Sequence, residues 1–236
     1  MTSRVPYELS EDDPSAPPIG LIVLQADETM ELEFRHAFRD HPSPIFVTRI
    51  ASSPEVTTQS LGAMQAGLAA AADLLPKARP YPVVGYGCTS ASAVIGSESV
   101  EKLVQRTCDT AAVTNPLRAA IACARDRGLS KLALLSPYIE EVNVPLREGF
   151  AQSGISTDVF ATFGEAEEAK VVRISTASVV EAASKLGADP NVEGVFLSCT
   201  NLRTLAAIPE IEARIGKPVL SSNQSLAWHI KRLSRP

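Results

Sequence analysis

The segment VFLSCTNLRTL, residues 195–205, decides the fold of this chain. An apolar run ends at Cys199, a turn of small polar residues follows, and the next residues predict a helix. An earlier segment, PVVGYGCTSAS at residues 82–92, repeats this order around Cys88. In both, Cys-Thr follows a buried strand and precedes residues that can cap a helix. Each half of the chain therefore has one cysteine at the end of a strand.

A cysteine in this setting faces the N-terminus of the next helix, where backbone N–H groups and the helix dipole favour a thiolate. Two such thiols, one from each half, would face each other across a cleft. The alternative is that each is a small buried hydrophobe, as free cysteines usually are. Cys108 and Cys123 lack the strand-to-turn setting, and Cys123 lies in an alanine-rich helical run, so we interpret it as core.

Strands and helices alternate along the whole chain. Apolar runs predict strands at 19–24, 45–50, 83–86, 132–135, within 155–163, and at 192–197 and 218–220. Helical patterns and caps predict helices at 30–39, 52–75, 97–107, 116–126, 140–153, 178–186, 204–215 and 221–233. The strand runs do not alternate with polar residues, which is typical of parallel sheets covered by helices on both faces. We therefore predict an α/β fold.

Ligands in such folds bind beyond the carboxyl ends of the strands. Asp27, Cys88, Tyr138 and Cys199 each follow directly after a predicted strand. We expect these four side chains to converge on one face. The predicted division of the chain is a mobile N-terminal tail at 1–18, a first lobe at 19–112 plus 219–236, and a second lobe at 113–218.

Composition excludes several classes of partner. The 236 residues suffice for one large domain or two lobes, and a net charge of −5 argues against nucleic acid and anionic membranes. No Cys-x-x-Cys pair is present and the three histidines are scattered, which argues against a metal site. No apolar stretch is long enough to span a membrane, and residues 1–18 do not resemble a secretion signal. We expect a cytoplasmic protein with reduced thiols.

Four short segments, in this order, resemble the aspartate/glutamate racemase superfamily, and in particular its maleate isomerase and arylmalonate decarboxylase branch. They are Gly87-Cys88-Thr89-Ser90, Ser136-Pro137-Tyr138, Ser198-Cys199-Thr200 and Ser221-Ser222-Asn223-Gln224. The similarity covers nearly all of residues 19–233. The segment at 24–29 is similar to that of the ectoine-utilization protein A group. The resemblance implies two pseudo-symmetric α/β lobes, one catalytic cysteine in each, no cofactor, and a substrate held between the cysteines in the cleft.

The resemblance also assigns roles to single residues. It makes Cys88 and Cys199 the catalytic pair. Positions that hold a substrate carboxylate match Thr89, Ser90, Tyr138 and Thr200. This agrees with physical chemistry, because a carboxylate that gains negative charge as its α-carbon loses a proton needs hydrogen-bond donors. The alternatives are that the Ser and Thr side chains only cap helices and that the tyrosine is a half-buried turn residue.

Two acids depart from the family pattern. Maleate isomerases have an asparagine where this chain has Asp27, and a second asparagine near Glu168. A carboxylate there would repel a second substrate carboxylate by about 1 to 4 kcal/mol at 4 Å. We therefore predict a substrate whose far end carries an amine or amidine that pairs with both acids. The alternatives are that Asp27 only caps its helix and that Glu168 is solvated.

The main functional hypothesis is a cofactor-independent isomerase or racemase acting on a small carboxylate, in which one thiolate removes the α-proton and the opposite thiol returns a proton. The helix N-terminus would lower the pKa of one thiol. The resemblance points to ectoine or hydroxyectoine breakdown, and the presence of both cysteines argues against a decarboxylase. The alternatives are maleate-type cis–trans isomerisation through a covalent thiol adduct, and a non-catalytic ligand-binding subunit. We expect a homo-oligomer, a dimer or larger.

Overall fold

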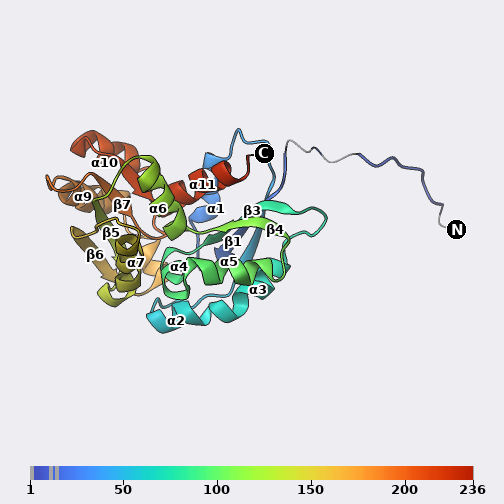
Figure 1. Cartoon of the computed structure of the whole chain (residues 1–236), viewed down its shortest axis with the longest axis horizontal. Coiled ribbons are helices and arrows are strands. Elements are labelled where there is room, and N and C mark those ends of the chain that lie inside the picture. The colour runs from blue at the N-terminus through green and yellow to red at the C-terminus, as the bar shows by residue number, and fades with distance from the viewer. Residues whose placement is uncertain (1–2, 11–12, 14–15, 236) are drawn as a thin grey trace.

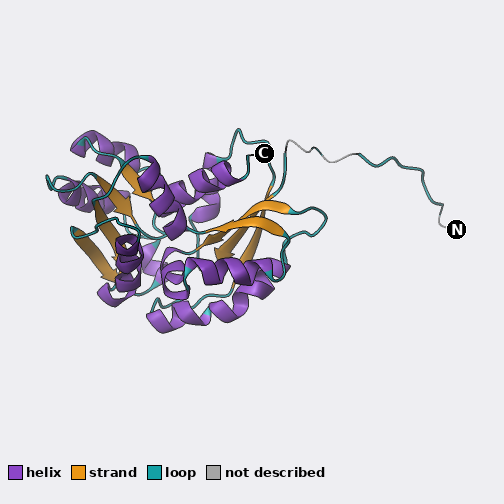
Figure 2. Ribbon diagram, in the orientation of Figure 1, coloured by secondary structure: helices purple, strands orange, loops and turns teal. Residues whose placement is uncertain are grey.

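A computed structural model describes residues 3–10, 13 and 16–235 of the chain. Within these residues the strands form two parallel sheets of four strands each, with orders β2-β1-β3-β4 and β6-β5-β7-β8 (Figure 2). The strands of the first sheet are β1 (Ile19–Leu24), β2 (Ile45–Ile50), β3 (Tyr81–Gly87) and β4 (Thr110–Thr114). Those of the second are β5 (Leu132–Tyr138), β6 (Phe160–Glu165), β7 (Gly194–Leu197) and β8 (Val219–Ser221).

Helices cover both faces of each sheet (Figure 1), which confirms the predicted α/β fold. Around the first sheet lie α1 (Met30–Ala37), α2 (Thr58–Ala63), α3 (Gln65–Asp73), α4 (Thr89–Ile95), α5 (Ser97–Gln105) and α11 (Ser222–Leu233). Around the second lie α6 (Pro116–Asp126), α7 (Glu140–Gln152), α8 (Glu168–Val171), α9 (Thr176–Gly187) and α10 (Ile208–Ile215).

One apolar cluster joins the two sheets. It contains buried residues of the first sheet, such as Ile22 and Tyr86, together with residues of the second, such as Leu135 and Leu197. Cysteines 88 and 199 and Tyr138 belong to the same cluster. The predicted site therefore lies where the two halves of the chain pack on each other.

The structure corrects several element boundaries. Strand β4 has the sequence TAAVT, whose low apolar content hides a strand at the sheet edge. The expected helix at 52–75 is two helices that meet at Met64, and the expected helix at 97–107 is preceded by the separate helix α4. Gly96 has a φ of 87° between α4 and α5, a conformation that ends a helix and favours glycine.

The predicted lobe boundary is wrong at β8. This strand pairs in parallel with β7, so residues 219–221 belong to the second sheet, and only α11 returns to the first. The pairing follows from the short connection after α10, which leaves β8 beside its neighbour in sequence. The rest of the predicted division stays a prediction. Positions 1, 2, 11, 12, 14 and 15 of the expected mobile tail lie outside the described residues.

In the part of the chain that the structure describes, no helix combines the length and apolar character needed to cross a membrane.

Candidate active site

Strand register explains why the predicted site residues meet. Val23 of β1 pairs with Gly87 of β3, so the turn that contains Asp27 begins beside Cys88. In the second sheet, Leu197 of β7 pairs with both Leu135 of β5 and Ser221 of β8. The residues that follow these strands therefore share the carboxyl edge of each sheet.

Cys88 directly follows β3 and is the N-cap residue of α4, and its sulfur accepts the Ala91 N–H at 3.4 Å. Only 5% of the residue is exposed. A Cβ at Gly87 would lie 2.4 Å from the sulfur of the buried Met30, so a larger residue there would have to displace that side chain. The predicted arrangement of strand, cysteine and helix N-terminus is present.

Cys199 has a φ of 95°, and it is the sole non-glycine residue with positive φ among those described. Its N–H donates to Ser222 Oγ at 3.0 Å, and its sulfur accepts the Asn201 N–H at 3.3 Å. Such a backbone conformation costs about 1 to 3 kcal/mol and concentrates at functional sites. The fold thus holds this sulfur in place at the expense of local strain.

The strain at Cys199 predicts that its glycine variant is more stable than its alanine variant, the opposite of the order expected at an unstrained cysteine. Cys199→Gly should be about 1 kcal/mol more stable than Cys199→Ala, because glycine adopts positive φ without a steric cost. At Cys123, which lies inside helix α6, the alanine variant should be the more stable of the two. Urea denaturation of the four variants measures both differences. Equal stability of the glycine and alanine variants at position 199 would contradict the strain.

Tyr138 lies at the end of β5 and connects a carboxylate to a thiol. Its hydroxyl is 2.8 Å from Glu168 Oε1 and 2.9 Å from the sulfur of Cys199. The second carboxylate oxygen of Glu168 accepts from Asn201 Nδ2 at 2.9 Å. Glu168 is 5% exposed and begins helix α8, so the alternative that this acid is solvated is wrong.

Backbone pairing with the first half of the chain positions this acid. Val56 N–H donates to the Ala166 carbonyl, and Glu168 N–H donates to the Pro54 carbonyl. Glu55 and Glu167 form an antiparallel bridge between the two segments. The loop after β2 therefore anchors the segment that presents Glu168.

Asp27 uses one carboxylate oxygen as a helix cap and leaves the other without a partner. Oδ1 accepts the N–H groups of Thr29 and Met30, both at 2.8 Å. Oδ2 is buried and has no hydrogen-bond partner. Capping is thus only half of what this side chain offers, and the other oxygen is available to a ligand.

The predicted hydroxyl donors divide into two kinds. Thr89 Oγ1 lies 2.8 Å from Ser222 Oγ, and Thr200 Oγ1 donates to the Gly87 carbonyl at 3.3 Å, so both contact other parts of the protein. Ser90 Oγ is buried without a hydrogen-bond partner. Their assignment to a substrate carboxylate stays a prediction, and Ser90 is the hydroxyl left free for it.

Three residues at the site had no predicted role. Asn201 contacts both Glu168 and Cys199, and its carbonyl accepts from Thr29 Oγ1 across the two halves. Ser222 contacts Cys199 and Thr89, and Glu33 accepts the N–H groups of 204 and 205. Asn201 lies in the segment around Cys199 and Ser222 in the segment at 221–224, so these two carried a sequence signal and Glu33 did not.

Electrostatics hold both thiols in the neutral form. Burial, together with the charges of Glu168 and Asp27, raises the pKa of Cys88 to about 12, against the N–H groups of Ala91 and Ser90. Burial and the charge of Glu168 likewise raise the pKa of Cys199. The expectation that a helix N-terminus lowers one of these pKa values is therefore wrong for the unliganded protein, because burial outweighs the backbone donors.

The two acids respond to burial in the same direction. Burial raises the pKa of Asp27, against the N–H groups of Met30 and Thr29, the side chain of Thr200 and the charge of Arg49. Burial also raises the pKa of Glu168, against its bonds from Asn201 and Tyr138. Both carboxylates act on both sulfurs, which places the two thiols and the two acids within electrostatic range of one another.

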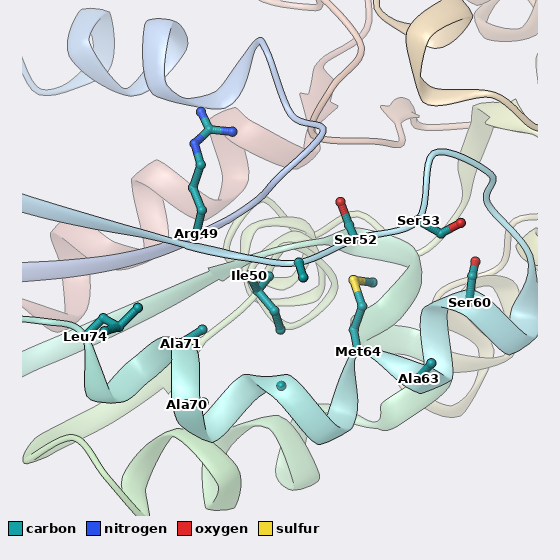
Figure 3. A pocket seen from close by; sticks show the side chains of 12 residues that line it. Arg49, Ile50, Ser52, Ser53, Ser60, Ala63, Met64, Ala70, Ala71 and Leu74 are labelled. Atoms are coloured by element: carbon teal, nitrogen blue, oxygen red, sulfur yellow. The ribbon is translucent and has the colours of Figure 1, made fainter.

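The groove in Figure 3 is a separate feature of the first half of the chain. Apolar and small side chains from the end of β2 and from α2 and α3 line it, among them Ile50, Met64 and Ala71. None of the predicted site residues lines it. The groove therefore does not belong to the candidate active site. Among the described residues, no group of three or more His, Cys, Asp and Glu side chains is arranged to hold a metal ion.

Comparison with known proteins agrees with this geometry. Residues 19–235 match the arylmalonate decarboxylase family. The chain is 35% identical over 124 residues to an arylmalonate decarboxylase from Bordetella bronchiseptica, a match that spans 52% of this chain and 49% of that relative. It is 26% identical over 226 residues to a maleate isomerase from Geobacillus stearothermophilus, covering 90% and 89% of the two chains. A maleate isomerase variant from Pseudomonas putida S16, solved with maleate, shares the fold with a TM-score of 0.81 at 19% identity, over 94% and 93% of the chains.

Proposed function

Because the chain belongs to the arylmalonate decarboxylase family, we propose that it is a cofactor-independent isomerase that uses Cys88 and Cys199 as an acid–base pair. The substrate is a small carboxylate that carries an amine or amidine. One observation supports this substrate class above all: Asp27 Oδ2 is a buried carboxylate oxygen without a partner, in the same site as both thiols. A buried carboxylate oxygen without a hydrogen-bond partner is costly, and a cationic ligand removes that cost.

The reaction moves one proton on each face of the α-carbon. One thiolate removes the α-proton, and the thiol from the other half of the chain supplies a proton to the opposite face. The carbanion spreads its charge into the substrate carboxylate, which the free hydroxyl of Ser90 can stabilise. The site thus provides a base, an acid and a hydrogen-bond donor.

A cationic substrate would also lower the raised pKa of the Cys88 thiol. In the unliganded protein the charges of Asp27 and Glu168 raise the pKa of Cys88 beyond the effect of burial. A cation bound at Asp27 offsets this negative charge and lowers the pKa of the thiol again. Substrate binding would therefore increase the thiolate fraction of Cys88 in the site where it is needed.

We extend the proposal to ectoine, hydroxyectoine or a ring-opened diamino acid as the substrate. Each combines a carboxylate with a nitrogen-centred cation, as the site requires. The support is the similarity of residues 24–29 to the ectoine-utilization protein A group, together with the acid at position 27 in place of an asparagine.

Thermal unfolding with candidate ligands tests the substrate class. Ectoine, hydroxyectoine and 2,4-diaminobutyrate should raise the melting temperature, since a ligand at 100 times its Kd adds about 2.7 kcal/mol of stability. Maleate and phenylmalonate should raise it less at neutral pH, because their second carboxylate meets Asp27. Stabilisation by the dicarboxylates alone would contradict a cationic substrate.

A maleate-type cis–trans isomerase is the second candidate. The maleate isomerase relative aligns over 89% of its length, and the cysteine of each half is present here. Because burial raises the pKa values of Asp27 and Glu168, these acids could bind a second carboxylate in their protonated forms. This reaction passes through a covalent thiol adduct, so intact-protein mass spectrometry after incubation with maleate distinguishes it.

A further inference from the structure

The contacts of Tyr138 connect the thiol of one predicted catalytic residue to a buried acid. We propose that Glu168 is the proton acceptor for Cys199, and that the hydroxyl of Tyr138 carries the proton between them. The proposal deepens the proposed function, because it concerns how the Cys199 thiol of the same site becomes a base.

The hydrogen-bond geometry allows only two proton arrangements. Tyr138 has one hydroxyl proton, and its oxygen contacts both Cys199 and Glu168 within hydrogen-bond distance. When the tyrosine donates to the carboxylate, its oxygen can accept from the S–H. When it donates to a thiolate, its oxygen can accept from a protonated Glu168.

The transfer between these arrangements conserves atoms and charge. The S–H bond of Cys199 breaks and its proton binds the oxygen of Tyr138, while the original tyrosine proton passes to Glu168 Oε1. The carboxylate becomes a neutral acid, and its negative charge moves to the sulfur. The reverse transfer returns the proton to Cys199 when the thiol is needed as the acid.

The surroundings favour a partner inside the protein over bulk water. Cys199 is 2% exposed, and Tyr138 and Glu168 are 5% exposed. Burial raises the pKa of Glu168, which makes this acid a better proton acceptor than an exposed glutamate. Asn201 supports both ends, because its amide donates to Glu168 Oε2 and its backbone N–H donates to the sulfur.

The hydrogen bonds of Glu168 differ from those of Asp27, the other acid of the site. Both oxygens of Glu168 are bonded to protein groups, whereas Asp27 keeps one oxygen free. Glu168 is thus positioned toward the thiol, and Asp27 is left for the ligand. The expectation that both acids bind the same substrate cation is replaced by two distinct roles.

Alkylation of Cys199 by iodoacetamide, followed by peptide mass spectrometry, tests the relay without any substrate. Two groups that share one proton give a thiolate fraction that does not change with pH between their two macroscopic pKa values. The wild-type rate should therefore show a level region between the pKa of Glu168 and that of Cys199. In Glu168→Gln that region should vanish because no second group shares the proton, so the rate should rise tenfold per pH unit and exceed that of wild type at neutral pH.

The outcome for Tyr138→Phe differs if Glu168 acts only by its charge. That variant would then keep the level region, because the carboxylate and its effect on the pKa of Cys199 remain. That result would overturn the proposal. Tyr138→Phe should also lose the level region, and the double variant should react no more slowly than the slower single variant.

Glu167→Gln is the matched control, since it removes the neighbouring exposed carboxylate, which pairs with Lys170. It should leave the pH profile of Cys199 unchanged. Cys108 and Cys123 serve as internal references for access of the reagent in every variant. Because the measurement needs no turnover, loss of the relay and failure of the proposed isomerase activity are detected separately.

Discussion

Replacing either Cys88 or Cys199 with alanine should abolish isomerisation while the protein stays folded. General acid–base catalysis contributes about 10²- to 10⁴-fold for each group, and isomerisation needs one group on each face of the α-carbon. Loss of either sulfur therefore removes a step for which the other sulfur cannot substitute. The rate of interconversion of the ligand's stereoisomers, measured by chiral chromatography, should fall at least about 10³-fold.

Exchange of the α-proton in D₂O distinguishes the two-thiol mechanism from a single-base mechanism. Each single variant retains one base, so it should still exchange the α-proton of one stereoisomer but not of the other. The two variants should show opposite preferences. Exchange of both stereoisomers by Cys88→Ala would contradict the two-thiol mechanism.

Cys123→Ala is the matched control for these variants. Cys123 is also a buried thiol, but it packs in a different apolar cluster, with Leu146 and Phe150. Its removal should lower stability by an amount similar to that for the site cysteines and leave the isomerisation rate unchanged. A loss of activity in this variant as well would show that packing, rather than proton transfer, explains the effect.

The fold could be predicted because its signals are local. Unbroken apolar runs such as Ile19–Leu24 and Leu132–Leu135 specify buried parallel strands, and caps such as Asn115 before Pro116 mark helix starts. Strand β4 was missed because an edge strand needs less apolar surface, so TAAVT resembles a connection. The placement of β8 depends on packing between distant segments, which no local pattern encodes.

The site residues that follow the ends of strands could be predicted from the sequence. Cys88, Cys199, Asp27 and Tyr138 converge because parallel strands place their carboxyl ends at one edge. The burial of Glu168 was not predictable from its acidic segment, because it depends on backbone pairing with residues 54–56. The pKa directions of the thiols were missed for the same reason, since the strength of desolvation depends on how tightly the two halves pack.

Asp27→Asn should reverse the ligand preference of the site. Asparagine can keep the helix cap through its carbonyl oxygen, but it presents no negative charge where Oδ2 now lies without a partner. Hydrogen bonds to charged groups contribute about 1.5 to 3 kcal/mol, so the affinity for a cationic carboxylate should fall about 10- to 100-fold. Binding of maleate should improve, because the repulsion of its second carboxylate disappears.

The same substitution should make Cys88 more reactive at neutral pH. The negative charge of Asp27 contributes, after burial, to the raised pKa of this thiol, so its removal lowers the pKa and increases the thiolate fraction at every pH below it. Faster alkylation of Cys88 at pH 8, together with calorimetric titration of both ligand classes, measures the two effects. Glu28→Gln removes an exposed carboxylate one residue along the chain and should change neither. Unchanged ligand preference in Asp27→Asn would show that the free oxygen of Asp27 does not contact the substrate, and that its burial serves only the helix cap.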